Sequence, residues 1–143
     1  MQNNSSDMVQ RAEDFARRAH KGQKDDDGED YFSAHIQVVA EIIKKVTTKS
    51  EIIAAAYLHD VIEDTATTRH ELIYRFGKRV ADLVFELTKV AERGEMDNRF
   101  PNLKSKDAMM IKFADRLSNI SRMGSWKGYR IKEYLDESAF WKT

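Results

Sequence analysis

Residues 51–65, EIIAAAYLHDVIEDT, contain the most apolar helical stretch of the chain, and this stretch ends in a histidine and several acidic residues. Ser50 is a good N-cap, so we expect a helix over about residues 51–62. A helix that is apolar on nearly every side is usually buried in the centre of a bundle. The sequence therefore predicts a helical core with His59 and Asp60 at the end of its central helix.

Apolar residues at helical spacing, together with capping residues, predict further helices on both sides of this one. One proline and six glycines in 143 residues argue against a turn-rich all-β fold. We expect an all-α compact helical bundle, a single domain over residues 1–143, in which residues 125–143 form an aromatic C-terminal helix packed on the rest. The alternative for this tail is a surface for a partner or for self-association, which leaves a homo-oligomer open. The expected helices span about residues 7–20, 33–46, 67–76, 79–91, 105–123 and 127–140.

The composition excludes several classes of protein. Lysine and arginine total 24, as do aspartate and glutamate, so charge gives no indication of a nucleic-acid or membrane partner. The absence of cysteine excludes disulfides, thiolate nucleophiles and zinc–sulfur sites. No apolar run approaches the roughly 20 residues that span a bilayer, and the polar N-terminus does not resemble a signal peptide. We therefore expect a cytoplasmic protein.

Polar side chains lie on helix faces that should be apolar. His35 falls on the same stripe as Val38 and Val39, and Asp115 lies inside the apolar stretch of residues 109–120. Asp60 ends the most apolar helix, and burying an isolated aspartate costs several kcal/mol unless a cation or a metal accompanies it. We expect His35, His59, Asp60 and Asp115 to hold one divalent metal ion.

The type of ligand indicates the type of metal. Two imidazoles and two carboxylates suit manganese or iron(II), and zinc less well, because soft thiolates are absent. Such an ion lowers the pKa of a bound water and polarises a phosphoryl group. Glu63 and Asp64 follow His59 and Asp60 by one helical turn, so they can orient the water and shuttle a proton.

Each of these residues also has an ordinary structural interpretation. His35 alone could be a hydrogen-bonded core histidine, and Glu63 with Asp64 a solvated acidic turn. Asp115 could form a salt bridge with Lys112 or Arg116. The joint occurrence favours the metal site, because separate helices would each need a different explanation. We interpret His20 and His70 as surface residues.

Several motifs in this order resemble the hydrolase domain of the RelA/SpoT proteins, a branch of the HD superfamily. They are AHKGQ (19–23), His35, AAYLHDVIEDT (55–65), FGKRVADLV (76–84), LTK (87–89) and KFADRLSN (112–119), and the resemblance covers about residues 10–124.

The resemblance implies an all-α HD fold, a manganese ion and hydrolysis of the 3′-pyrophosphate of (p)ppGpp by a small stand-alone enzyme. It implies that His35, His59, Asp60 and Asp115 bind the metal, that Glu63 and Asp64 form the catalytic acidic pair, and that Asn119 contacts the nucleotide.

The loop after residue 23 departs from the family pattern. The family normally carries basic residues there that bind substrate phosphates, followed by two prolines. Here the loop reads KDDDGEDYFSAH, in which Lys24 is the only basic residue. Lys24, together with Lys112 and Asn119 on the polar side of the Asp115 helix, forms our expected set of substrate contacts. Carboxylates oppose phosphate binding unless the loop turns away or a second cation intervenes.

This departure leaves two alternatives to a (p)ppGpp hydrolase. The first is an HD phosphatase that acts on another nucleotide, such as a nucleoside monophosphate or the 2′-phosphate of NADPH. The second is a nucleotide-binding regulatory module that does not hydrolyse its ligand. A structural bundle without metal is the weakest alternative.

Overall fold

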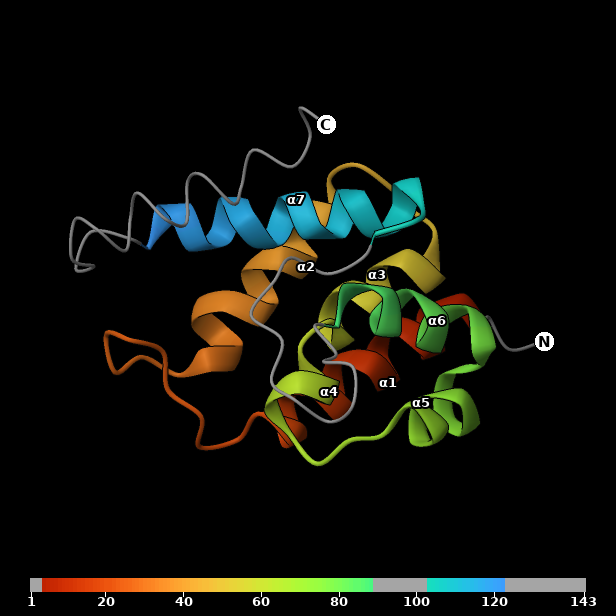
Figure 1. Ribbon diagram of the computed structural model, residues 1–143, viewed down its shortest axis with the longest axis horizontal. Coiled ribbons are helices and arrows are strands. Elements are labelled where there is room, and N and C mark those ends of the chain that lie inside the picture. Colours follow the sequence, from red (N-terminus) through yellow and green to blue (C-terminus); the bar gives the residue numbers. More distant parts are fainter. Residues whose placement is uncertain (1–3, 89–102, 123–143) are drawn as a thin grey trace.

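The computed structural model describes residues 4–88 and 103–122, and every regular element in these ranges is a helix (Figure 1). The expected all-α fold is confirmed. The elements in chain order are α1 (Asn4–Ala19), the π-helical turn η1 (Phe32–Ile36), α2 (Gln37–Lys44), α3 (Ser50–Leu58), α4 (Val61–Asp64), α5 (Arg69–Phe76), α6 (Lys78–Leu87) and α7 (Lys106–Ser121). None of the described helices is both long and apolar enough to span a membrane.

Helix α3 is the centre of the bundle, as its composition predicts. Every residue from Ile52 to Leu58 is buried. Helices α1, α2 and α6 pack around α3, and α7 lies against α2 and α6 (Figure 1). Each large apolar side chain buried in this way contributes about 1.5–3 kcal/mol relative to exposure. The core therefore fixes the C-terminal end of α3, where the histidine and aspartate lie.

The predicted helix over residues 51–62 is wrong at its C-terminal end. Helix α3 ends at Leu58, Asp60 adopts φ −106° and ψ 0°, and the separate turn α4 begins at Val61. This backbone conformation belongs to the sparsely allowed bridge region, where many active-site residues lie. In a continuous helix two consecutive side chains do not face the same point. The break therefore allows His59 and Asp60 to contribute to one cluster.

The expected N-cap of α3 is also wrong. Lys49, and not Ser50, occupies the N-cap position of α3, and its side chain makes no capping bond. Ser33 lies inside η1, where its backbone N–H and its hydroxyl donate to the Asp30 carboxylate at 3.0 and 2.9 Å. Ser33 therefore donates to a neighbouring carboxylate here, and the N-cap position of η1 is Tyr31, whose side chain makes no capping bond.

The remaining boundaries agree more closely with expectation. The side chains of Thr68 and Ser105 cap α5 and α7 by accepting from backbone N–H groups three residues on. Gly77 ends α5 with φ +91°, a conformation that favours glycine. Helix α6 begins one residue before the expected start. The predicted end of the helix 79–91 is wrong, because α6 ends at Leu87 and Thr88 is extended. The expected helix 127–140 and the aromatic tail 125–143 lie outside the described residues, so the single-domain prediction stays a prediction.

Candidate metal centre

Four side chains from three parts of the fold form one cluster. His35 comes from η1, His59 and Asp60 from the break between α3 and α4, and Asp115 from α7. Each offers one nitrogen or oxygen atom, and these four atoms lie within 4.8 Å of one another. His35 Nε2 lies 2.8 Å from Asp115 Oδ1, and His59 Nε2 lies 3.2 Å from Asp60 Oδ2. The structure therefore brings together all four residues that the sequence analysis selected as metal ligands.

Both imidazoles turn the same ring nitrogen toward the centre of the cluster. His59 Nδ1 donates to the Ala56 carbonyl at 2.7 Å, so in the neutral imidazole, the form that binds a metal, Nε2 carries the lone pair. That Nε2 is buried and makes no hydrogen bond. The Ser118 hydroxyl, 2.9 Å from His35 Nδ1, can accept from it and leave the His35 Nε2 lone pair free. Metal-ligating histidines are oriented in this way by a hydrogen bond to their other ring nitrogen.

The two carboxylates of the cluster are ionised and need a positive charge beside them. Burial alone raises the pKa of Asp60 and of Asp115, but the facing imidazoles, with Lys112 beside Asp115, outweigh burial and lower both pKa values. Burial disfavours a charge on His59, but the two carboxylates outweigh it and raise its pKa. Two nitrogen and two oxygen donors gathered around one point, with only Asp60 partly exposed, fit a divalent ion.

Two further side chains hold the carboxylates of the cluster. The Tyr31 hydroxyl donates to Asp60 Oδ2 at 2.6 Å, and its ring centroid lies 5.3 Å from that of His35. Lys112 is 7% exposed, and its ammonium donates to Asp115 Oδ2 at 2.9 Å. Burial and the Asp60 carboxylate raise the pKa of the Tyr31 hydroxyl, which therefore stays protonated as a donor.

The acidic pair lies on α4, one turn beyond Asp60. Glu63 and Asp64 are both exposed. Asp64 Oδ2 accepts a hydrogen bond from Gln23 Nε2 at 3.1 Å. Partial desolvation and the Asp60 carboxylate raise the pKa of Asp64. A carboxyl group with a raised pKa is better suited to take up and release a proton near neutral pH.

The acidic loop is tied to α7 by an arginine. Arg122 Nη1 lies 2.8 Å from Asp25 Oδ2, and Arg122 Nη2 donates to Asn119 Oδ1 at 2.6 Å. The other Asp25 oxygen accepts from the backbone N–H groups of Asp27 and Glu29, and the side chain is only 4% exposed. Although desolvation opposes it, these bonds and Arg122 lower the pKa of Asp25.

The three expected substrate contacts occupy different surroundings. Lys24 is exposed and forms an isolated antiparallel bridge with Asp30. Lys112 is buried against Asp115, and Asn119 is bonded to Arg122. Of these three residues, only Lys24 is an exposed cation.

The sequence analysis missed four side chains that support this site. The interpretation of His20 as a surface residue is wrong, because its side chain is 1% exposed, whereas His70 is exposed as expected. Tyr31 precedes His35 by four residues and Ser118 follows Asp115 by three, so helical spacing could have placed both beside ligands. Gln23 lies in the AHKGQ motif together with His20, but nothing in the motif shows that the two side chains meet.

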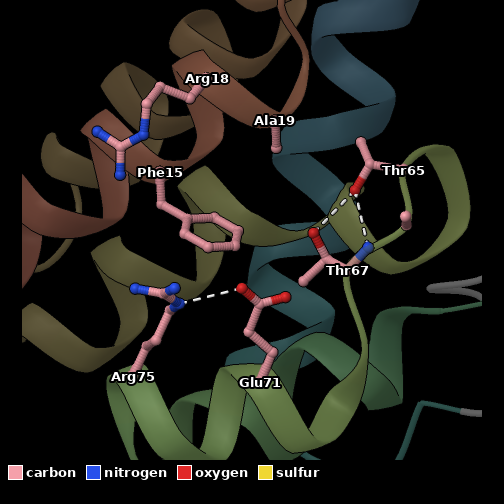
Figure 2. Close-up of a pocket in the computed structure, with 8 residues that line it drawn as sticks. Phe15, Arg18, Ala19, Thr65, Thr67, Glu71 and Arg75 are labelled. Atoms are coloured by element: carbon pink, nitrogen blue, oxygen red, sulfur yellow. Dashed lines mark hydrogen bonds and ion pairs between the residues drawn. The ribbon is translucent and has the colours of Figure 1, made fainter.

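A separate open pocket of about 450 Å³ lies between α1, the loop after α4 and α5 (Figure 2). Figure 2 shows Glu71 and Arg75 paired on α5, facing Phe15 on α1, with the Thr65 and Thr67 hydroxyls bonded to each other. None of the residues that line it belongs to the metal cluster.

The helical fold and the His–Asp cluster are those of an HD-type protein, and the chain belongs to the HD domain family, which matches residues 12–138. Among curated proteins it is 33% identical over 141 residues to human guanosine-3′,5′-bis(diphosphate) 3′-pyrophosphohydrolase MESH1, a match that covers 90% of this chain and 79% of that one. It is also 33% identical over 141 residues to guanosine-3′,5′-bis(diphosphate) 3′-pyrophosphohydrolase of Aquifex aeolicus, a match that covers 93% of this chain. The match spans only 20% of the length of that bacterial relative.

The bifunctional (p)ppGpp synthase/hydrolase SpoT of Escherichia coli is 36% identical over 121 residues, or 77% of this chain and 17% of SpoT. Among solved structures, a metazoan orthologue of SpoT that hydrolyses ppGpp superposes with a TM-score of 0.76. That match has 25% sequence identity and covers 92% of this chain and 82% of the other.

Proposed function

We propose that this protein is a metal-dependent phosphohydrolase that removes the 3′-pyrophosphate of (p)ppGpp, giving GDP or GTP and pyrophosphate. The observation that carries this proposal is the largely buried cluster of His35, His59, Asp60 and Asp115, whose donor atoms lie within 4.8 Å of one another. The relatives that share 33% identity with this chain over 141 residues are named for this reaction.

The ligand set supports manganese as the resident ion, with iron(II) or zinc as alternatives. When bound, such an ion lowers the pKa of a coordinated water and polarises a phosphoryl oxygen. His59 supplies a lone pair fixed by Ala56, and Asp60 a carboxylate oriented by Tyr31. Lys112 lies against Asp115 and limits the negative charge that the cluster presents to a phosphate.

The acidic pair supplies the proton transfers of the reaction. The attacking water must lose a proton, and the 3′ oxygen must gain one when its bond to phosphorus breaks. Asp64, whose pKa is raised, and its neighbour Glu63 are exposed beside the cluster, where a substrate can reach them. We assign Asn119 and Lys24 to the nucleotide, and with them Lys112, whose ammonium is shared with Asp115.

One observation favours a second candidate, an HD phosphatase that acts on a nucleoside monophosphate or on the 2′-phosphate of NADPH. Arg122 lies against the acidic loop, but its guanidinium is already paired with the Asp25 carboxylate. A guanidinium that is bonded to a carboxylate binds an additional phosphate group less well. A substrate with fewer phosphates would tolerate this arrangement better than (p)ppGpp. The third candidate, a nucleotide-binding module without turnover, has less support, because both members of the acidic pair are present.

A substrate panel separates these candidates. Purified protein with Mn²⁺ is incubated with ppGpp, GMP and NADPH, and the products are resolved by anion-exchange chromatography. We expect GDP and pyrophosphate from ppGpp, and no products with Asp60→Ala. Phosphate release from GMP or NADPH, with ppGpp intact, would support the second candidate. Metal-dependent nucleotide binding without any product would support the third.

A further inference from the structure

A chain of hydrogen bonds joins the buried His20 to the acidic residue Asp64 through the side chain of Gln23. His20 Nδ1 lies 2.8 Å from Gln23 Oε1, and Gln23 Nε2 donates to Asp64 Oδ2 at 3.1 Å. His20 is 1% exposed and comes directly after α1, whereas Asp64 ends α4. Gln23 therefore links a buried side chain to a carboxylate at the surface of the site.

The chemistry of the three groups fixes the direction of this chain. An ionised Asp64 only accepts hydrogen bonds, so Gln23 must present its NH₂ group to it. The amide oxygen of Gln23 then faces His20, and Nδ1 of His20 must carry the proton and donate. His20 Nε2 is left as a buried lone pair without a hydrogen-bond partner. One carboxylate thus determines both the amide orientation and the tautomer of the imidazole.

The backbone of Gln23 is held at both of its polar groups. Its N–H donates to the His20 carbonyl at 2.9 Å, and its carbonyl accepts from the N–H of Tyr31, also at 2.9 Å. Tyr31 is the residue whose hydroxyl holds Asp60. The supports of Asp60 and of Asp64 are therefore joined through one backbone hydrogen bond, and the two carboxylates are positioned by the same short segment.

We propose that Gln23 is a positioning residue that orients the Asp64 carboxylate for the reaction, with His20 as the buried anchor that fixes the Gln23 amide. The inference rests on the proposed function of Asp64. A group that takes and returns a proton must be held close to its reacting partner, and hydrogen bonds to a second layer of side chains provide this orientation.

The test replaces Gln23 by glutamate. Gln23→Glu keeps the size of the side chain and an oxygen for His20, but it removes the donor to Asp64. We expect kcat to fall about 10–100-fold, as is typical for the loss of a supporting partner, with KM and bound manganese unchanged. Gln10→Glu is the matched control, because Gln10 Nε2 bonds to Asp14 at 3.0 Å in the same way on the exposed face of α1. A role in packing alone predicts that Gln23→Glu retains the parent kcat, and that result, or a loss of manganese, would overturn the proposal.

A second measurement does not depend on turnover. Imidazole ¹⁵N spectra of the parent protein should show His20 as the Nδ1–H tautomer, and Gln23→Ala should abolish this preference. An Nε2–H tautomer in the parent, or a spectrum that Gln23→Ala leaves unchanged, would contradict the chain of hydrogen bonds. If the parent does not hydrolyse ppGpp, the proposed function fails, and the tautomer still decides whether Gln23 is held as described.

Discussion

The hydroxyl of Tyr31 offers the clearest test of how the cluster is built. Tyr31→Phe removes the 2.6 Å hydrogen bond to Asp60 and keeps the ring, which lies 5.3 Å from His35 and 5.4 Å from His20 between centroids. A hydrogen bond to a carboxylate is among the stronger bonds in proteins and fixes the direction of the ligand oxygen. Loss of such a support weakens metal binding about 10–100-fold, which corresponds to about 1.4–2.7 kcal/mol.

The assay is calorimetric titration of chelator-treated protein with Mn²⁺. The control is Tyr57→Phe, which removes a hydroxyl that accepts from Lys44 at 2.8 Å in another part of the core. We expect Tyr31→Phe to weaken manganese binding by at least ten-fold and Tyr57→Phe to leave it unchanged. Equal affinities for the parent and Tyr31→Phe would refute the argument that this hydroxyl orients a metal ligand. An equal loss in both variants would show a general effect on the fold.

Three further predictions concern the loop, a helix cap and pH. Asp25→Asn releases Arg122 from its ion pair, so KM for ppGpp should fall several-fold, and this effect should weaken with added salt. Glu29→Gln makes the same change of charge and should leave KM near the parent value. Identical effects of the two variants would contradict a specific pairing of Asp25 with Arg122. Thr68→Ala removes the cap of α5 and should lower the free energy of unfolding by about 1 kcal/mol in urea titrations, whereas an unchanged midpoint would argue against the cap. The raised pKa of His59 means that the metal-free protein binds a proton there at pH 7, so manganese binding should release protons and strengthen from pH 6 to pH 8. Calorimetric titrations in buffers of different ionisation enthalpy measure this proton release. Manganese binding without proton release would contradict the raised pKa of His59.

The raised pKa of His59 also fixes how this residue changes the free energy of unfolding with pH. Its pKa in the folded, metal-free protein lies well above the ordinary value of 6.5. The stabilisation that it contributes is therefore complete below about pH 6.5 and is lost as the pH rises through the raised pKa.

The fold class and the four candidate ligands could be predicted from the sequence, because each candidate is a polar residue that interrupts the apolar pattern of its own segment. The apolar residues 52–58 identify the central helix, and every one of them is buried. His35, Asp60 and Asp115 are polar groups on faces that pack against other helices, so burial requires a partner for each. The structure shows that these residues meet one another and that Ser118, Tyr31 and Lys112 supply further partners.

The rest of the site depends on contacts between distant segments, which local patterns do not contain. The Asp25–Arg122 pair joins residues 97 positions apart, and the Gln23–Asp64 bond joins residues 41 apart. The break at Asp60 was missed because the apolar periodicity continues through Val61 and Ile62 while the backbone does not. His20 looks like an exposed helix end in the sequence, but in the structure it is buried and its ring contacts that of Tyr31.

The most direct test of the central claim is hydrolysis of ppGpp by protein that has been stripped with a chelator, assayed before and after addition of Mn²⁺. Asp60→Ala serves as the paired control, because it removes one of the four ligands of the cluster. We expect no product from the stripped protein, release of pyrophosphate and GDP once manganese is restored, and no activity of Asp60→Ala in either condition. Equal rates with and without manganese, or full activity of Asp60→Ala, would contradict the assignment of this cluster as the metal centre of a phosphohydrolase.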